Sequence, residues 1–413
     1  MRLYRVELKR MGKTRSVQLL LLFSVLVTLL FSYLPISFVE YSCQENGEEV
    51  LVKGMKAIEL RKEAWNPYKG QVTEDKISAA LAQFQEGRAK YGNDGMFFDM
   101  PASEYCEKIA PISSLVYRLR EVNADSKTGM APDYQELTEE DALNFYRQCY
   151  QRLDDVLRME QSKHPAAIRQ AKALYSTVEM PFSYYPGFNA DAVDYLVLLI
   201  LVLTIVAALI AAPVFSSEYQ TGSDNILRCT KHGGTPLAAA KIQVTLTITS
   251  ALYLFCVGLY LLIEGAAFGW DTLKTSIQVI YSATSFPALN IGQLELATAG
   301  AGLLAYIATV LCVLFLSSKL NAVYTTASLA LLLCILPSFS SSFLPSIVDL
   351  WARCLLPSGG IGLNSFVFEL LDTRFLHLGG LSLWYPFALL LSTTVGIPLW
   401  SFASVQSYKR HQM

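Results

Sequence analysis

Residues 17–39 read VQLLLLFSVLVTLLFSYLPISFV, an apolar run without a single charged side chain. A helix needs about 20 such residues to cross the hydrocarbon core of a bilayer. A cleaved signal peptide has a shorter apolar stretch that ends at small residues, whereas this run ends at Phe38-Val39-Glu40. The run therefore predicts a retained transmembrane helix over 17–39.

Five further apolar runs follow along the chain. They predict spanning helices at 193–215, 242–263, 296–316, 322–344 and 383–405. Pro337 and Pro398 fall inside the last two, which membrane helices tolerate when neighbouring helices satisfy the freed carbonyls. The sequence thus predicts an all-α membrane protein with six transmembrane helices, five of them within residues 193–405.

Residues 40–192, which we call the insert, differ in composition from the rest of the chain. They hold 18 basic and 25 acidic residues, a net charge of −7, whereas the remainder holds 15 basic and 10 acidic residues. The insert therefore has the charge density of a water-exposed domain. Thr73, Thr138 and Pro165 each precede or open an apolar-periodic run in the manner of a helix start. A mainly helical domain is predicted between the first and second spans.

Three features of the insert carry expectations about its surface. The aromatic stretch 180–188 (MPFSYYPGF) is expected to pack the domain onto the membrane surface. His164, the single histidine of the insert, is expected at the surface. Cys43, Cys106 and Cys149 allow one disulfide if the insert lies in an oxidising compartment, and the sequence does not choose the pair.

Basic residues flank the spans on one side. They occupy the stretch before the first span, the loops after the second and fourth spans, and the tail 406–413: Arg2, Arg5, Lys9, Arg10, Lys13, Arg15, Arg228, Lys231, Lys241, Lys319, Lys409 and Arg410. Short loops rich in lysine and arginine stay in the cytoplasm. Both termini are therefore predicted to be cytoplasmic, and the insert extracytoplasmic.

Residues 1–16 predict a cytoplasmic amphipathic helix in the membrane interface. Arg5, Lys9 and Arg10 would meet lipid phosphates, while Leu3 and Leu8 would face the apolar layer. A charged flank without helical structure is the alternative.

Residues 345–383 form a segment between the fifth and sixth spans that proline and glycine interrupt too often for a membrane crossing. Short helices that dip into the outer leaflet, with charged residues at their water-facing ends, are expected there. The candidates for an outer gate are Arg353, Glu369, Asp372 and Arg374. An ordinary surface loop is the alternative.

No motif for catalysis or metal binding occurs in the sequence. A phosphate-binding G-x-x-x-x-G-K-[ST] loop, a G-x-S-x-G turn and an H-E-x-x-H pair are absent, and the eight cysteines lack C-x-x-C spacing. Glu264 and Glu295 fall at the outer ends of the third and fourth spans and are expected to act as interfacial caps. We therefore expect a chain without catalytic residues, cofactor, metal, nucleic-acid binding or an energy source of its own.

The loop between the second and third spans mixes apolar and charged residues in a short stretch. Residues 216–241 read SSEYQTGSDNILRCTKHGGTPLAAAK. A short amphipathic helix that presents Ile226 and Leu227 could dock in a cleft of a partner protein. A solvated connector is the alternative, and it would not need this mixture.

This loop resembles the one after the second span in bacterial ABC-transporter permeases of the type-2 exporter family. The family pattern is E-Y-x-x-G-[ST]-D-x-I-L-x-x-[ST]-K-x-G-R-x-x-L-x-x-A-K-I, and the chain departs from it at Gly234, where the family has arginine. The matching residues are Glu218, Tyr219, Gly222, Asp224, Ile226, Leu227, Thr230, Lys231, Gly233, Leu237, Ala240, Lys241 and Ile242. The opening VELKR (6–10) and the long insertion after the first span are similar to that family as well.

The resemblance implies an exporter permease with a second permease subunit, identical or different, and a separate cytoplasmic ABC ATPase that binds ATP and Mg²⁺. It implies outward movement of a peptide, drug or lipid-like substrate by alternating access across a bacterial cell membrane. Members with large external domains are associated with export of, or immunity to, antimicrobial peptides. The residues expected to couple to the ATPase are Glu218, Tyr219, Gly222, Ile226, Leu227, Arg228 and Lys231. The alternative is a membrane-anchored sensor or immunity protein whose external domain binds a peptide.

Overall fold

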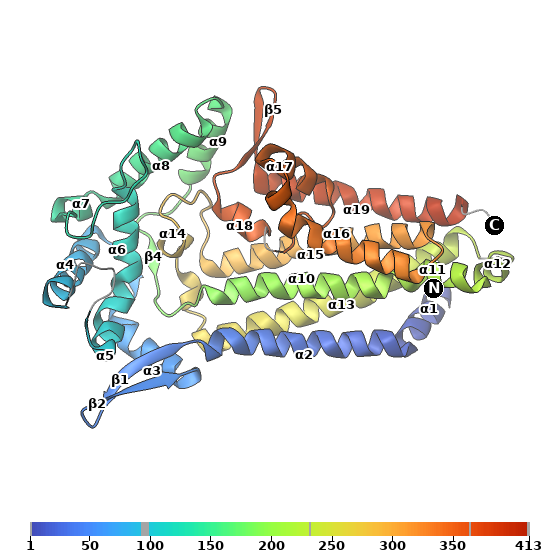
Figure 1. Ribbon diagram of the computed structural model, residues 1–413, viewed down its shortest axis with the longest axis horizontal. Coiled ribbons are helices and arrows are strands. Elements are labelled where there is room, and N and C mark those ends of the chain that lie inside the picture. The colour runs from blue at the N-terminus through green and yellow to red at the C-terminus, as the bar shows by residue number, and fades with distance from the viewer. Residues whose placement is uncertain (1, 92–98, 231–232, 363–364, 411–413) are drawn as a thin grey trace.

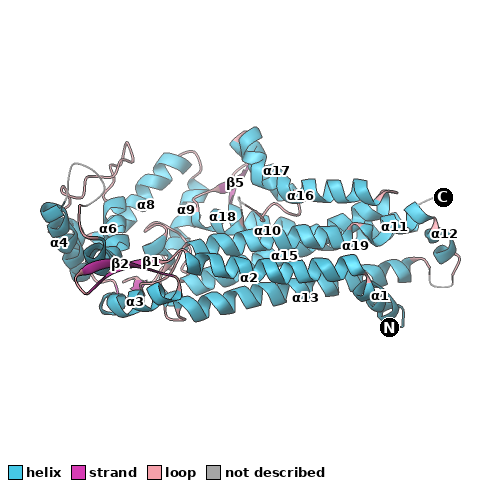
Figure 2. Cartoon of the chain, turned by 60° about the horizontal axis from the view of Figure 1, so that its bottom comes forward, coloured by secondary structure: helices cyan, strands magenta, loops and turns pink. Residues whose placement is uncertain are grey.

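A computed structural model of the chain describes residues 2–91, 99–230, 233–362 and 365–410. Within these ranges, six helices are long and apolar enough to cross a membrane, and they lie side by side as a bundle (Figure 1, Figure 2). The spans are α2 (Arg15–Ser37), α10 with its continuation α11 (Asp191–Ala211 and Pro213–Thr221), α13 (Thr235–Phe268), α15 (Ile291–Lys319), α16 (Val323–Phe343) and α19 (Tyr385–Arg410). The prediction of an all-α membrane protein is confirmed for the six candidate spans, whose ends differ from the predicted ones by one to seven residues, but the described residues also form three small two-stranded sheets.

The first span, α2, shows how the bundle packs. Its buried face carries Ser24, Thr28 and Ser32, whose hydroxyls donate to the carbonyls four residues earlier at 2.9, 2.8 and 2.9 Å. Small side chains at this spacing let neighbouring helices approach closely. Large apolar side chains lie on the opposite, exposed face: Leu19, Leu22, Leu26 and Leu30. This distribution is the reverse of a soluble helix and fits a helix whose outer surface meets lipid.

The insert is mainly helical, as predicted. Thr138 and Asp141 form a capping box at the start of α7, and Pro165 is the first residue of α9. Its elements are β1 (Glu40–Glu45), β2 (Glu48–Lys53), α3 (Met55–Trp65), η1 (Asn66–Tyr68), β3 (Gly70–Gln71), α4 (Glu74–Tyr91), α5 (Ala102–Glu104), η2 (Tyr105–Ile109), α6 (Ala110–Val122), α7 (Glu139–Leu143), α8 (Phe145–Gln161), α9 (Pro165–Tyr175) and β4 (Ser183–Tyr184).

A β-hairpin, which the sequence analysis did not predict, opens the insert. Strands β1 and β2 pair antiparallel with Glu45 opposite Glu48, so Asn46 and Gly47 alone form the turn. Their φ angles of 55° and 86° are the left-handed values that a two-residue hairpin turn requires. The pairing brings the chain back to the end of α2 before α3 begins, and the Gly54 amide donates to the Val39 carbonyl at 2.9 Å.

The insert and the two chain termini lie at opposite ends of the molecule. Figure 1 shows α4, α6 and α7 at its left end, and α1 (Arg2–Lys13), α12 (Ser223–Arg228) and both chain ends at its right. We call these the domain end and the terminal end. An even number of crossings places both termini on one side, and the long helices run between the two ends.

The insert rests on the connection between α13 and α15, which contains η3 (Thr272–Lys274) and α14 (Ile277–Ile280). The Tyr175 hydroxyl donates to the Ala283 carbonyl at 2.8 Å, and the Tyr185 amide donates to Thr275 Oγ1 at 2.9 Å. One continuous apolar core joins the insert to the domain ends of α10 and α15. Tyr185 belongs to the stretch 180–188, which the sequence predicts to pack the domain onto the membrane surface and which here packs on the α13–α15 connection.

The segment 345–383 forms two short helices and a second unpredicted hairpin. Its elements are α17 (Ser346–Leu355), α18 (Phe366–Leu371), β5 (Phe375–Leu378) and β6 (Leu381–Trp384). Gly379 and Gly380 form the hairpin turn between Leu378 and Leu381. The short helices are as predicted.

The possible disulfide is not formed, because all eight cysteines are free thiols. Cys149 is buried in the main apolar core of the insert, whereas Cys43 and Cys106 pack on a separate cluster near the end of α2. The three thiols are therefore divided between two packing environments.

His164 is half-buried rather than a free surface residue. Its imidazole stacks on that of His377 in the β5–β6 hairpin, with ring centroids 3.5 Å apart and an interplanar angle of 7°. His377 Nδ1 also lies 3.0 Å from the Ser382 hydroxyl. This stacked pair joins the insert to the hairpin that leads into α19.

The stacked pair predicts that the hairpin is less protected at acidic pH. Burial, followed by the nearby His164, holds the pKa of His377 below its ordinary value. The unfolded hairpin therefore takes up the proton first, and the contact weakens as the pH falls below about 6.5. Hydrogen exchange of residues 375–384, corrected for intrinsic rates, should be faster at about pH 5.5 than at about pH 7.5. His164→Gln should reduce this difference, and equal protection at both pH values would contradict the prediction.

Candidate functional site

The N-terminal helix α1 is present, and it packs on the bundle at the terminal end. Leu8 and Met11 join the apolar core there, and the Tyr4 hydroxyl donates to Thr247 Oγ1 at 3.1 Å. Arg5 and Lys9 are exposed and thus available to lipid phosphates, as the amphipathic pattern predicts. Arg10 differs, because it contacts carboxylates of the protein itself.

A buried ion-pair network holds α1, α11 and α13 together. Arg10 Nη1 lies 3.0 Å from Glu218 Oε1, and Arg10 Nη2 lies 2.7 Å from Glu7 Oε2. The second Glu218 oxygen, Oε2, pairs with the Lys241 ammonium. Glu218 is 4% exposed and Lys241 is 0% exposed. Lys241 also lies 3.4 Å from the Val214 carbonyl oxygen.

The position of Glu218 in this network gives it a different role from the predicted one. Glu218 was predicted to couple to a partner, but its side chain is buried within the protein. Its contribution is to fix the angle between α11 and the neighbouring helices. Lys241, a residue of the family-like pattern that the site prediction omitted, supplies the opposite charge.

The turn from α11 into α12 is made at Gly222. Its φ of +68° is left-handed, which glycine adopts without strain, and it ends α11 and begins α12. Beyond this turn the chain leaves the bundle as the six-residue helix α12.

Arg228 anchors α12 to the end of the last span. Its Nη2 donates to the Tyr408 carbonyl at 3.0 Å, and its guanidinium lies 4.8 Å from the centroid of the Tyr408 ring. The Tyr219 ring lies on the other side at 5.8 Å, and Asp224 Oδ2 is 3.6 Å from Arg228 Nε. Tyr408, which the sequence analysis did not single out, thus connects α12 to α19.

Ile226 stands out from this anchored helix. Its side chain is 74% exposed, whereas Leu227 beside it is half-buried. Leu227 lines hollows on both sides of α12, one of about 640 Å³ toward α1 and one of about 440 Å³ toward α11. The wall of the larger hollow includes Val6 and Pro236. Lys231, the remaining predicted coupling residue, lies outside the described residues.

The predicted gate residues lie in α17, α18 and the loop before β5, away from the terminal end, and form a second ion-pair network (Figure 1). Arg353 Nη1 lies 2.6 Å from Glu369 Oε1 and 3.8 Å from Asp349 Oδ2, and its guanidinium is 5.4 Å from the centroid of the Tyr385 ring. Arg374 lies 2.8 Å from Asp372 and 3.5 Å from Glu369.

The expectation that these charges lie at water-facing ends is wrong for two of them, Arg353 and Glu369. Arg353 is 0% exposed, and Asp349 and Glu369 are buried as well, because they neutralise one another beneath α17. The outward face of α17 is apolar instead, with Ile347 and Leu355 exposed. Asp372 and Arg374 remain solvent-accessible. The network connects α17, α18 and α19 rather than lining an opening.

Glu264 and Glu295, which the sequence predicts to be interfacial caps, are buried rather than exposed. Both side chains are buried between the spans, and no described residue donates a hydrogen bond to either carboxylate oxygen of Glu264. The two residues lie on α13 and α15, which contact each other. The sequence located them near the ends of the apolar runs but could not show that they face inward.

No protein-family model matches this chain, and no curated protein matches it in sequence. Its function is therefore inferred from the geometry of the terminal end and from the pattern of residues 218–242.

Proposed function

We propose that this chain is the membrane-spanning subunit of an ATP-driven exporter, with a separate cytoplasmic ABC ATPase docking on α12. The observation that carries the proposal is an exposed apolar side chain, Ile226, on a short helix that is anchored to the bundle on both sides. An exposed isoleucine at the edge of a hollow fits a contact with another protein better than a solvated loop.

The anchoring contacts supply the mechanical part of the proposal. Force applied at Ile226 would pass through Arg228 to α19 and through α11 to the Glu218 network. That network reaches α1 and α13. A movement of the ATPase would therefore displace several spans together, as alternating access requires. The insert would then face outward at the exit side, where it could meet a peptide, drug or lipid-like substrate.

The test is whether purified, tagged protein captures an ABC ATPase subunit, the first candidate being any such subunit encoded by a neighbouring reading frame. Ile226→Asp should reduce capture at least tenfold, because it places a charge where an apolar pocket is expected. Ile226→Leu should retain capture, and Asn225→Asp provides a matched control with the same added charge one residue away. Equal capture by Ile226→Asp and wild type would refute the docking role.

The rival function, a peptide sensor without transport, makes a different prediction. In that case the insert would bind peptide with unchanged affinity in the Ile226→Asp variant, and no ATPase would be captured by the wild-type chain. The capture experiment therefore separates the two.

A further inference from the structure

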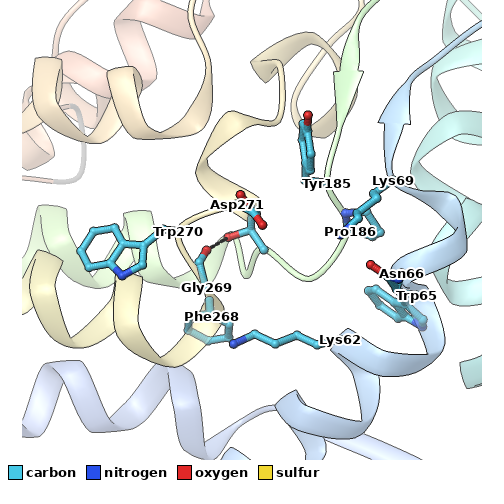
Figure 3. A pocket seen from close by; sticks show the side chains of 11 residues that line it. Lys62, Trp65, Asn66, Lys69, Tyr185, Pro186, Phe268, Gly269, Trp270 and Asp271 are labelled. Atoms are coloured by element: carbon cyan, nitrogen blue, oxygen red, sulfur yellow. Dashed lines mark hydrogen bonds between the residues drawn. The ribbon is translucent and has the colours of Figure 1, made fainter.

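A cavity of about 340 Å³ lies where the insert meets the domain end of α13 (Figure 3). Its walls come from three separate parts of the chain: the end of α3 with η1, the loop after β4, and residues 268–272. Figure 3 shows Lys62 extending toward Phe268 and Gly269, and Lys69 on the opposite side near Tyr185.

The depth of this cavity matches the headgroup layer of a bilayer. The apolar run of α13 ends near Ile263, and the cavity begins at Phe268, five residues later. Five helical residues rise about 7.5 Å, and the headgroup layer on each face of a bilayer is about 5–8 Å thick. The cavity is therefore beyond the hydrocarbon but still within reach of lipid phosphates.

The cavity wall carries two lysines and one carboxylate, Asp271, so its net charge is positive. Glu59 acts on Lys62 and Asp271 acts on Lys69, both from beyond ion-pair distance. Lys62 Nζ donates to the Ala267 carbonyl at 2.6 Å, which uses one of its three hydrogens. Within the part of the chain that the structure describes, neither Lys62 nor Lys69 has a carboxylate within 4.0 Å of its ammonium. Asp271, the acidic residue of the wall, pairs with Lys274 at 2.6 Å. Burial holds the pKa of Lys62 below its ordinary value, so a bound anion would favour its charged form.

The backbone leaves room for the Lys62 side chain. Gly269 has a φ of +96°, and a Cβ there would lie 3.2 Å from Lys62 Cε. Any other residue would be strained at this angle and would crowd the lysine. The local geometry thus keeps the ammonium at the end of α13.

Aromatic and aliphatic side chains extend from the cavity toward the membrane. Trp65 is buried and donates from Nε1 to the Cys106 carbonyl at 2.9 Å, while Trp270 is 56% exposed. Tryptophan and tyrosine are favoured at the headgroup level. Leu262 and Phe255, seven residues apart and so on one side of α13, are exposed below the cavity. They provide a surface for acyl chains.

We propose that this cavity binds the phosphate of an anionic phospholipid from the leaflet on the insert's side, between the Lys62 and Lys69 ammonium groups. The aromatic walls contact the glycerol region, and the acyl chains run along the exposed face of α13. A bound lipid of this kind joins the insert to α13 and stabilises their relative placement. The inference is independent of the proposed exporter function.

The test is native mass spectrometry of the detergent-solubilised full chain during titration with phosphatidylglycerol. Lys69→Ala and Lys62→Gln should each lower the affinity roughly fivefold, the size expected for removing one lysine near an anionic surface. Glutamine at 62 retains a donor for the Ala267 carbonyl. Lys56→Ala, on the same helix but outside the cavity wall, should stay within about twofold of wild type.

Two further measurements distinguish binding of an anionic lipid from binding of other ligands. Phosphatidylcholine should bind more weakly than phosphatidylglycerol to wild type, and an excess of sodium phosphate should not displace the bound lipid. If Lys69→Ala and Lys62→Gln behave like Lys56→Ala, the site does not exist. Displacement by sodium phosphate would instead assign the cavity to a free anion and overturn the lipid proposal.

Discussion

Glu218→Ala is expected to destabilise the chain by about 3–5 kcal/mol, because it leaves the Lys241 ammonium buried without its counter-charge. Lys241 is fully buried, and the Glu7 carboxylate acts on it only from beyond ion-pair distance. Its remaining contacts are the Val214 carbonyl and the Phe215 ring. Neither replaces a carboxylate. Arg10 is less affected, since it is partly exposed and retains Glu7. The midpoint of thermal unfolding in mild detergent should fall clearly below that of wild type.

A double variant separates charge burial from loss of packing. Glu218→Leu with Lys241→Met removes both charges, and its midpoint should lie nearer to wild type than that of Glu218→Ala. Glu45→Ala serves as a control, because Glu45 is exposed at the end of β1. A Glu218→Ala midpoint equal to that of Glu45→Ala would show that the pair contributes nothing.

Arg353→Ala is expected to loosen the whole segment from α17 to α18. The arginine compensates two buried carboxylates, Glu369 and Asp349, so its loss leaves Asp349 without a cation and Glu369 with only the half-exposed Arg374 at 3.5 Å. The free-energy cost of burying uncompensated charge here is of the same order as for Glu218→Ala, about 3–5 kcal/mol. It should destabilise the local structure of this segment before the rest of the chain. Hydrogen exchange over residues 346–355 and 366–371 should increase by more than tenfold.

Arg374→Ala provides the matched control for this prediction. Arg374 also lies near Glu369, at 3.5 Å, but its side chain is half exposed. Exposed ion pairs contribute about 0–1 kcal/mol. Exchange should therefore change little in Arg374→Ala, and similar exchange in both variants would refute the role assigned to Arg353.

The six spans could be predicted because lipid imposes a simple requirement on sequence. About 20 uncharged apolar residues are needed for each crossing, and the run 17–39 satisfies this without knowledge of any neighbour. Helix starts in the insert were equally local: Thr138 and Asp141 cap each other within four residues. Local sequence signals of this kind predict helices reliably because the structures they specify need no partner that is distant in the sequence.

Both β-hairpins have local turn signals in the sequence, although neither hairpin was predicted. Asn46-Gly47 between alternating residues is a strong hairpin signal, and Gly379-Gly380 was interpreted only as a break. The ion pairs are different, because no short-range pattern shows them. Arg10 meets Glu218 across 208 positions of sequence. The available hint was Lys241 itself, a lysine at the start of an apolar helix, which needs a counter-charge once it is buried.

The candidate site was therefore predicted in part. The exposure of Ile226 and its place on a short helix after Gly222 agree with the expectation from residues 216–241. The burial of Glu218 and the anchoring of Arg228 on Tyr408 depend on tertiary packing between α12, α11 and α19. No local pattern in the sequence reveals such contacts.

The central claim is that the insert and α12 lie on opposite sides of the membrane, and thiol labelling tests it most directly. Ser126 is exposed in the insert, and the native Cys229 is exposed beside α12. In intact cells, a membrane-impermeant maleimide should modify Ser126→Cys but not Cys229, with labelled peptides identified by mass spectrometry. Cys229 should react only after the membrane is permeabilised. Labelling of Cys229 in intact cells, with Ser126→Cys protected, would contradict the topology and the exporter proposal with it.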